Sequence, residues 1–304
     1  MSAPSDAAVV GDQPLPVKAI PVRHPWRWVT AAVLVVLAAM VAHSLIANPA
    51  WHWATVRQYV FSDPILKGLL LTLEFTVGAM VMGVVLGIVL AVMRLSSNPI
   101  VKGVAWIYIW FFRGTPVLVQ IIFWSFLAQL YRFLSIGIPF GKEFVFFDTN
   151  LLIPTWLGGL LALGLNEGAY MAEIVRAGIA SVDPGQTEAG EALGMTRLKV
   201  MRRIVLPQSI RIILPPTGNE TISMLKTTSL LAIASIYELF GTAQNIYGSN
   251  YEQIPLLVVA SLWYLLLTSL MSIGQYFLEK RFGRGVVNIK RRTKPRPITS
   301  AVGA

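Results

Sequence analysis

The chain has 304 residues, of which 55% are hydrophobic and only 13% are charged, and its mean hydropathy is +0.63. Soluble domains carry about 25% charged residues, so a chain this apolar would expose large sticky patches in water, and lipid is the better solvent for it. The absence of Cys excludes disulfides and Cys-ligated metals, whereas the net charge of +10 leaves a nucleic-acid partner open until the basic residues are placed.

The first segment, residues 1–25, is rich in Pro, Ala and Val and is predicted to be a disordered tail. The apolar run that follows Trp28 lacks a small-residue cleavage site. We therefore interpret it as a retained first membrane span and not as a signal peptide.

Membrane-spanning helices need about 20 mostly apolar residues. The sequence predicts an all-α, polytopic membrane region at 26–282 with about six transmembrane helices. The fifth helix is interrupted by Pro215 and Pro216, and Gly83 and Gly87 on the second favour intramolecular helix packing over a dimer contact. The predicted spans are 29–47, 68–93, 117–133, 152–175, 212–240 and 255–277.

Most of the 25 Lys and Arg residues fall on one side of this topology. The positive-inside rule then places both termini in the cytoplasm, including the basic tail at 283–304. Topology thus accounts for the excess charge, and no nucleic-acid partner is expected. The segments predicted to face outward hold only Arg57, Lys67, Arg132 and Lys142.

The cytoplasmic loop at 178–208, between the fourth and fifth spans, has the signals of a short capped helix. Asp183 and Pro184 form a strong helix start, and Gly194 is a natural stop. A second segment begins at Thr196, and Pro207 is expected to break it. From the pattern alone, this helix either docks on a partner protein or lies on the lipid surface.

The loop also resembles the EAA motif of ABC-importer permeases, Glu-Ala-Ala-x₃-Gly-x₉-Ile-x-Leu-Pro, and every spacing fits. One position departs from the motif, because Gly190 stands where Ala is usual. In that family the loop is the coupling helix that docks on an ATPase subunit. The matching residues are Glu188, Ala189, Gly190, Gly194, Ile204 and Pro207.

Further motifs over about 65–282 are similar to the branch of that family that imports polar amino acids. They include Arg113-Gly114-Thr115-Pro116, Glu167-xx-Tyr170-xx-Glu173-xx-Arg176 and Lys226-x-Thr228-Ser229. The helix at 29–47 lies outside this family core. The resemblance implies a type I ABC importer fold in a bacterial inner membrane. It also implies two ABC ATPase subunits, a second permease copy or sister permease, and an extracytoplasmic solute-binding protein.

Ionisable side chains at membrane depth are functional candidates, because their burial in lipid is costly. Glu173 and Arg176 are expected to pair near the cytoplasmic face. Glu167 lies two turns deeper and either contacts a cationic group of the substrate or makes a structural hydrogen bond. Glu74 lies close enough to the outer end of the second span to reach water.

Arg113 precedes a helix that opens at Pro116, and free N–H groups at such a start can face a substrate carboxylate. In the alternative, the segment is a structural bend in which Arg113 caps neighbouring carbonyls. A second polar group is expected either to line a pathway or to join helices, with the proline pair loosening the helix as in broken transporter helices. Its members are Asn219, Glu220, Lys226, Thr228 and Ser229.

No Walker A loop, His-Glu-x-x-His pair or Gly-x-Ser-x-Gly elbow occurs in the chain. We therefore expect a transport subunit that binds no cofactor, with ATP and Mg used by its partners. The alternatives are an ion-coupled secondary transporter, which would not need a docking loop, and a membrane enzyme, which would need a catalytic cluster.

Overall fold

The computed structural model describes residues 25–282, which divide into two compact units between Trp51 and His52. The predicted tails at 1–25 and 283–304 lie outside the described residues, apart from Pro25. In the first unit the structure describes α1 (Pro25–Ala47) and the short η1 (Pro49–Trp51). α1 therefore begins four residues before the predicted first span and ends with it.

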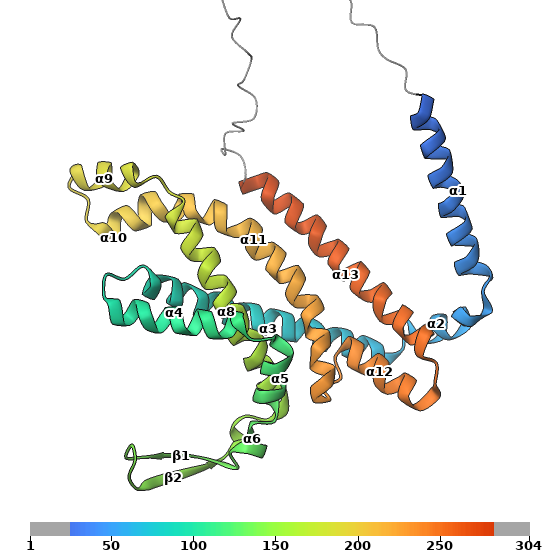
Figure 1. The fold of residues 1–304 in the computed structure, drawn as a ribbon, viewed down its shortest axis with the longest axis horizontal. Helices are drawn as coiled ribbons and strands as arrows, with labels where there is room; N and C mark the ends of the chain where they lie inside the picture. Colours follow the sequence, from blue (N-terminus) through green and yellow to red (C-terminus); the bar gives the residue numbers. More distant parts are fainter. Residues whose placement is uncertain (1–24, 283–304) are drawn as a thin grey trace, which may run out of the picture. The chain divides into compact units, whose positions relative to one another are not determined.

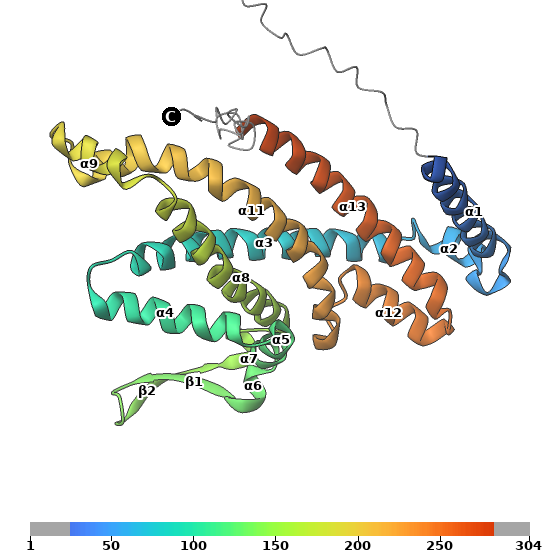
Figure 2. The same cartoon turned by 45° about the horizontal axis from the view of Figure 1, so that its top comes forward.

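The second unit is almost entirely helical (Figure 1). α9 and the start of α10 lie at one end of this unit, and α12 lies at the opposite end (Figures 1 and 2). Its helices are α2 (Trp53–Tyr59), α3 (Asp63–Arg94), α4 (Pro99–Gly114), α5 (Val117–Ser125), α6 (Leu127–Leu130), α7 (Thr149–Leu152), α8 (Thr155–Ala180), α9 (Pro184–Ala192), α10 (Arg197–Val200), the π-helical η2 (Met201–Val205), α11 (Leu206–Thr227), the 3₁₀-helical η3 (Thr228–Ala234), α12 (Leu239–Asn250) and α13 (Gln253–Phe282).

Three described helices, α1, α3 and α13, are long and apolar enough to cross a membrane. Two bent pairs bring the number to five: α4 with α5, and the helix from Arg197 to Ala234 with α12. α8 is less apolar because it carries Asn166, Glu167 and Glu173, but its 26 residues are long enough to span. The predicted count of about six is reached only when both bent pairs and α8 each count as one span.

Glycines hold α3 and α8 in close contact. A Cβ atom added at Gly87 would come within 2.9 Å of backbone atoms of α8, and one at Gly168 within 2.8 Å of Leu86 on α3. The helices approach this closely because neither glycine has a side chain. The prediction that Gly83 and Gly87 serve packing within the chain is therefore confirmed.

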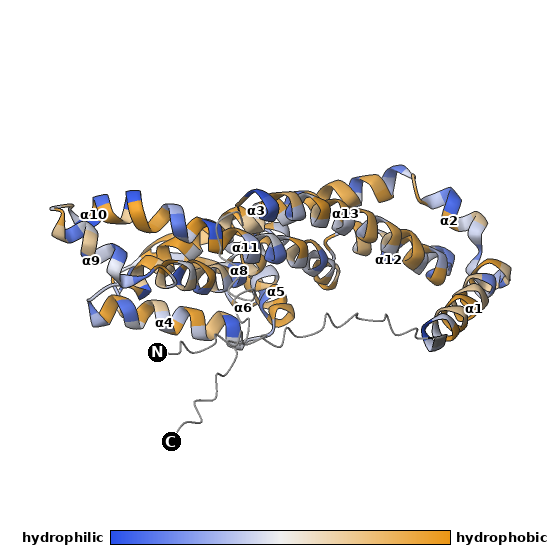
Figure 3. Cartoon of the chain, turned by 90° about the horizontal axis from the view of Figure 1, so that it is seen from above, coloured by the Kyte–Doolittle hydropathy of each residue, from blue (hydrophilic) through white to orange (hydrophobic). Residues whose placement is uncertain are grey.

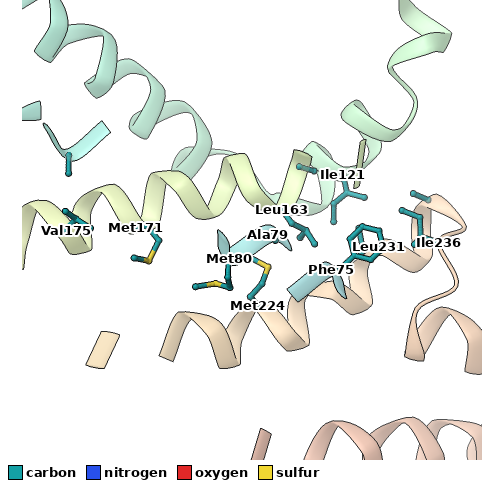
Figure 4. Close-up of a cluster of buried hydrophobic side chains, with 13 residues drawn as sticks. Phe75, Ala79, Met80, Ile121, Leu163, Met171, Val175, Met224, Leu231 and Ile236 are labelled. Atoms are coloured by element: carbon teal, nitrogen blue, oxygen red, sulfur yellow. The ribbon is translucent and has the colours of Figure 1, made fainter. Parts of the chain in front are cut away.

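The main core of the second unit forms where α3, α5, α8, α11 and η3 meet (Figure 4). Around it, the outward faces of α3 and α13 carry exposed aliphatic side chains, as expected of a surface that contacts lipid. In Figure 3, hydrophobic residues predominate along α13, whereas hydrophilic residues gather at α9. The core includes Phe75, Met80, Ile121, Leu163, Met171, Met224 and Leu231.

The bounds of the third span were predicted wrongly. The span at 117–133 ends as a helix at Ser125, and the preceding α4, which was not predicted, forms the first limb of the same bent pair. The all-α class is confirmed with one departure, since β1 (Phe133–Gly137) and β2 (Glu143–Asp148) form an antiparallel hairpin. Alternating Phe, Val and Ile residues favour strands there, and the run is too short for a span.

Pro207 does not break the helix, contrary to the expectation. The helix passes through the π-turn η2, where the N–H of Leu206 bonds to the carbonyl of Met201 five residues earlier, and α11 then continues to Thr227. Pro215 and Pro216 also lie inside continuous helix. The break comes later, after η3, where Ser235 adopts a left-handed conformation and α12 leaves at 43°.

Candidate functional site

A cavity of about 540 Å³ opens where the α4–α5 bend, α8 and α11 face one another. Three of the charged residues predicted at membrane depth meet there, from three different elements. Neutral polar side chains and the first turn of α5 complete the lining. The lining residues are Arg113, Gly114, Thr115, Pro116, Val117, Asn166, Glu167, Tyr170, Glu220, Ser223, Met224 and Thr227.

The bend between α4 and α5 shapes one wall of this cavity. The two helices meet at 101°, because Thr115 is extended before Pro116 and a proline cannot continue the hydrogen-bond ladder. The buried amide of Gln120 donates to the carbonyls of Phe112 (3.0 Å) and Thr115 (3.1 Å). Asn166 donates to the Phe112 carbonyl as well, at 2.8 Å.

The side-chain amides of Gln120 and Asn166 thus bond the carbonyls at the bend, which one alternative had expected Arg113 to cap. The Arg113 guanidinium instead lies over the ring of Tyr170, with 5.1 Å from Cζ to the ring centroid. Its charge therefore stays available at the cavity, beside the first turn of α5, where Val117 contributes to the lining. A helix start beside a guanidinium is a favourable environment for a carboxylate.

Glu167 is the most buried charged residue of the cavity, with 3% of its surface exposed. Its Oε1 atom has no hydrogen-bond partner among the described residues. The side chain packs against Gly83 of α3, where the missing Cβ leaves room for it. Glu220 lines the same cavity from α11. An unpaired buried carboxylate is costly, so this arrangement suits a cationic partner from outside the chain.

The other predicted pathway residues lie elsewhere. Asn219 accepts a hydrogen bond of 2.9 Å from Gln275 of α13. Lys226 and Ser229 line a separate cavity of about 380 Å³ beside α13. Thr228 is fully buried and donates to a carbonyl of the preceding turn. The interhelical contact of Asn219 matches the structural alternative, and the pathway role of the group stays a prediction.

Two neutral lining residues, Asn166 and Ser223, were not singled out from the sequence, and Tyr170 was named only within a family motif. A signal for them existed in the helical spacing. On α11, Ser223 and Thr227 follow Glu220 by three and seven residues, which places all three on one helix face. Tyr170 follows Glu167 by three residues on α8 in the same way.

The predicted pair of Glu173 and Arg176 is confirmed, with 2.7 Å between Glu173 Oε2 and an Arg176 nitrogen. Arg94 of α3 adds a weaker contact to the same carboxylate at 3.9 Å. The pair is half-buried at the end of α8 that leads into the loop before α9. The contact from Arg94 connects that end of α8 to α3.

Glu238 is a fully buried charged residue that the sequence reasoning missed. It caps α12 by accepting hydrogen bonds from the N–H groups of Phe240 (3.0 Å) and Gly241 (2.7 Å). Tyr264 of α13 donates to it at 2.8 Å, and Thr72 of α3 at 3.3 Å. A carboxylate one residue before an apolar helix is an N-cap signal that could have found it. Its role here is to join three helices.

The loop at 178–208, which is predicted to dock on an ATPase subunit, contains the expected capped helix. The Asp183 side chain accepts a hydrogen bond from the Gly185 N–H at 2.8 Å, and Gly194 has φ +77, the left-handed conformation expected after the helix. Gly190 is buried, and an added Cβ would meet Ile204 and a neighbouring valine at 3.0 Å. This close contact explains why glycine stands at a position where the motif usually has alanine.

The outer surface of this loop is open. Glu188 and Ala189 on α9 are exposed, and Pro207 is exposed in the first turn of α11. Leu193 and Leu198 are 83% and 77% exposed. Exposed leucines beside a short polar helix favour a surface that another protein covers.

A family model described as "Binding-protein-dependent transport system inner membrane component" matches residues 83–284. The chain belongs to this family, and it is the permease subunit of an ABC importer, a transport subunit and not an enzyme. Its place in an inner membrane follows from the same family, and so does its dependence on ATPase and binding-protein partners.

Curated relatives and solved structures support this assignment. The chain is 48% identical over 294 residues to the arginine transport system permease protein ArgU of Corynebacterium glutamicum, covering 96% of this chain and 91% of the relative. It is 34% identical to the L-cystine transport system permease protein TcyB of Bacillus subtilis, covering 80% and 96%.

Among solved structures, an amino acid ABC transporter crystallised with histidines is 34% identical with a TM-score of 0.62, covering 73% of this chain and 95% of that one. The inward-facing MetNI methionine transporter shares the fold at 16% identity and a TM-score of 0.54, covering 73% and 99%. Both likenesses agree with the expected type I importer fold.

Proposed function

We propose that this permease carries a polar amino acid with a cationic side chain, and that the central cavity holds it. The observation that carries the proposal is the Glu167 side chain, which lines the same cavity as Arg113 and whose buried Oε1 has no hydrogen-bond partner among the described residues. Glu167, with Glu220 nearby, would bind the basic side chain or the ammonium group. Arg113 and the first turn of α5 would bind the carboxylate.

The relatives support an amino-acid cargo, since their names specify arginine and L-cystine, and a solved relative is an amino acid transporter. Two carboxylates face one guanidinium in the cavity, so a cargo with surplus positive charge suits it best. L-Arginine, with its basic side chain, is the cargo that we propose to test first.

The assembly that we propose has two ABC ATPase subunits, a second permease copy or sister permease, and an extracytoplasmic solute-binding protein. ATP and Mg are used in the ATPases. The residues from Glu188 to Pro207 form the docking surface, supported by the capped α9 and by the exposed Leu193 and Leu198. Both chain termini would face the cytoplasm of a bacterial cell, with lipid around the apolar helix faces.

We propose that residues 26–282 form the permease domain and that α1 is an addition to the family core. The family model begins at residue 83, later than the expected core boundary at about 65. The described residues 25–51 form a unit separate from the rest of the chain, which supports treating α1 as an addition. Lys226, Thr228, Ser229 and Asn219 are kept as a second polar region beside α13, with a pathway role still to be tested.

The test is binding and uptake of radiolabelled L-arginine by the complete complex in proteoliposomes. Glu167→Gln keeps the size of the side chain and removes its charge, so the apparent affinity should fall about tenfold or more, the usual loss for one charge-assisted hydrogen bond. Glu74→Gln is the matched control, because Glu74 is an exposed glutamate that lies outside the central cavity. Equal arginine affinity in both variants would remove Glu167 from the site.

A further inference from the structure

A second cavity of about 490 Å³ adjoins the central one. The two cavities share Arg113, Gly114 and Tyr170 in their linings. The second cavity is otherwise lined by α4 and by the α3 and α8 ends, with Trp106, Trp110, Arg94 and Glu173 among its residues. The shared residues therefore form a common wall between two spaces that both contain charged groups.

The common wall is a weak contact between two helices. Arg113 on the last turn of α4 lies over the Tyr170 ring on α8 at 5.1 Å, and Arg113 has no salt bridge with any described residue. An exposed cation–π contact contributes little energy, so a cargo carboxylate that binds the guanidinium can displace it from the ring.

The order of residues along α8 shows that the second cavity lies on the side of the central cavity that is nearer the coupling loop. Glu167, Tyr170 and Glu173 follow one another at intervals of three residues, so Glu173 lies about 9 Å beyond Glu167 along the helix axis. The helix continues from there into the loop that leads to α9. A cargo that moves from the central cavity toward the coupling loop would therefore enter the second cavity.

The chemistry of the second cavity also fits an amino acid. Glu173 already holds Arg176 at 2.7 Å, so Arg94 and Arg113 leave surplus positive charge for a carboxylate. The rings of Trp106 and Trp110 stack with their centroids 6.3 Å apart and 13° between their planes. Flat aromatic surfaces of this kind bind guanidinium and ammonium groups.

We propose that the second cavity is a further station for the same amino acid on its way to the coupling-loop side, and that the Arg113–Tyr170 contact is the partition between the two stations. The proposal rests on the central cavity being the cargo site. It assigns Tyr170 a positioning role: its ring holds Arg113 between the two stations, so that the cargo crosses only when the guanidinium turns away.

The first experiment uses the absence of native cysteines. In the complete complex in lipid nanodiscs, single thiols are introduced as Ser223→Cys in the central cavity, Ile109→Cys in the second, and Ile107→Cys as an exposed neighbour outside both. L-Arginine at about ten times its apparent dissociation constant should slow modification of the two cavity thiols about tenfold, since most sites are then filled. It should leave Ile107→Cys unaffected.

The outcomes separate the two proposals. Protection of Ser223→Cys without protection of Ile109→Cys would overturn the second station and leave the proposed cargo site intact. Protection of neither thiol would overturn both. Equal protection of Ile107→Cys would indicate a general conformational change and would also overturn the second station.

A second measurement addresses the partition itself. Tyr170→Ala removes the ring, so arginine should slip back between stations and the ATP hydrolysed per arginine imported should rise about two- to fivefold, the range expected from loss of one cation–π contact. Tyr170→Phe keeps the ring and should keep the ratio closer to that of the unsubstituted protein. The same amount of ATP hydrolysed per arginine imported in the alanine variant and the unsubstituted protein would show that Tyr170 does not separate the two stations.

Discussion

Gly83 of α3 determines whether Glu167 of α8 can take up its buried position. A methyl group at Gly83 would come within 2.7 Å of the Glu167 Cβ and closer still to its Cγ. Real Cβ atoms do not approach this closely, so either the glutamate or the helix must move. The position of Glu167, which we propose binds the cargo, thus depends on Gly83, a residue that does not itself line the cavity.

We predict that Gly83→Ala lowers the free energy of unfolding by about 1–3 kcal/mol through overpacking and weakens arginine uptake at the same time. Gly103→Ala on α4 is the control, because nothing lies within 4 Å of its added Cβ. There alanine should stabilise the helix by roughly 0.5–1 kcal/mol. Thermal unfolding of the purified permease measures the stability of both variants, and uptake in proteoliposomes measures their activity. A Gly83→Ala protein as stable and as active as Gly103→Ala would contradict the close packing.

The sequence predicted the charged part of the cavity better than its neutral part. A charge at membrane depth is costly and therefore marks a functional candidate, which identifies Arg113, Glu167 and Glu220. Ser223 and Thr227 carry no such signal, because a hydroxyl can be satisfied within its own helix, as Thr227 is by the carbonyl of Ser223 at 3.0 Å. Their spacing places them on the same helix face as Glu220, and the fold shows that this face lines the cavity.

At the scale of elements, the sequence predicted most of the helices but not how they are interrupted. Apolar length identifies α3, α8 and α13, whereas Pro207 was expected to break a helix and Pro215 and Pro216 to interrupt the fifth span. Pro207 is accommodated by a π-turn, and Gln275 of α13 donates a hydrogen bond of 3.3 Å to the Pro215 carbonyl within continuous helix. Packing against a neighbouring helix decides these cases, and a single sequence does not show it.

The proposed coupling element can be tested at Gly194, which follows α9 with φ +77 and where an added Cβ would meet nothing within 4 Å. Gly194→Asp adds strain of about 1 kcal/mol and a negative charge on an exposed surface, so we expect normal membrane insertion with weaker ATPase recovery and uptake. Gly194→Asn is the matched control, because it has the same size, no charge and some tolerance of this conformation. Copurification with the ATPase and uptake in vesicles measure both variants. Full recovery and uptake by Gly194→Asp would favour the alternative of a helix lying on lipid.

At the scale of the whole molecule, the orientation in the membrane follows from charge and not from the fold. The structure places the α9 end and the α12 end of the second unit apart (Figure 1), but helices of this kind cross lipid equally well in either direction. The positive-inside rule distinguishes the two directions. It predicts that α9 lies in the cytoplasm and that the hairpin of β1 and β2, which is flanked by Arg132 and holds Lys142, lies outside.

Two single thiols in this Cys-free chain test the orientation in intact cells. Gln186→Cys lies on α9 and should be protected from an impermeant thiol reagent until the cells are opened. Phe140→Cys lies in the exposed turn of the hairpin and should react from outside without lysis. Each thiol is the control for the other, because both sites are exposed in the structure and differ only in the predicted side of the membrane. Labelling of Gln186→Cys in intact cells, with protection of Phe140→Cys, would invert the topology and place the proposed docking surface on the side without ATP.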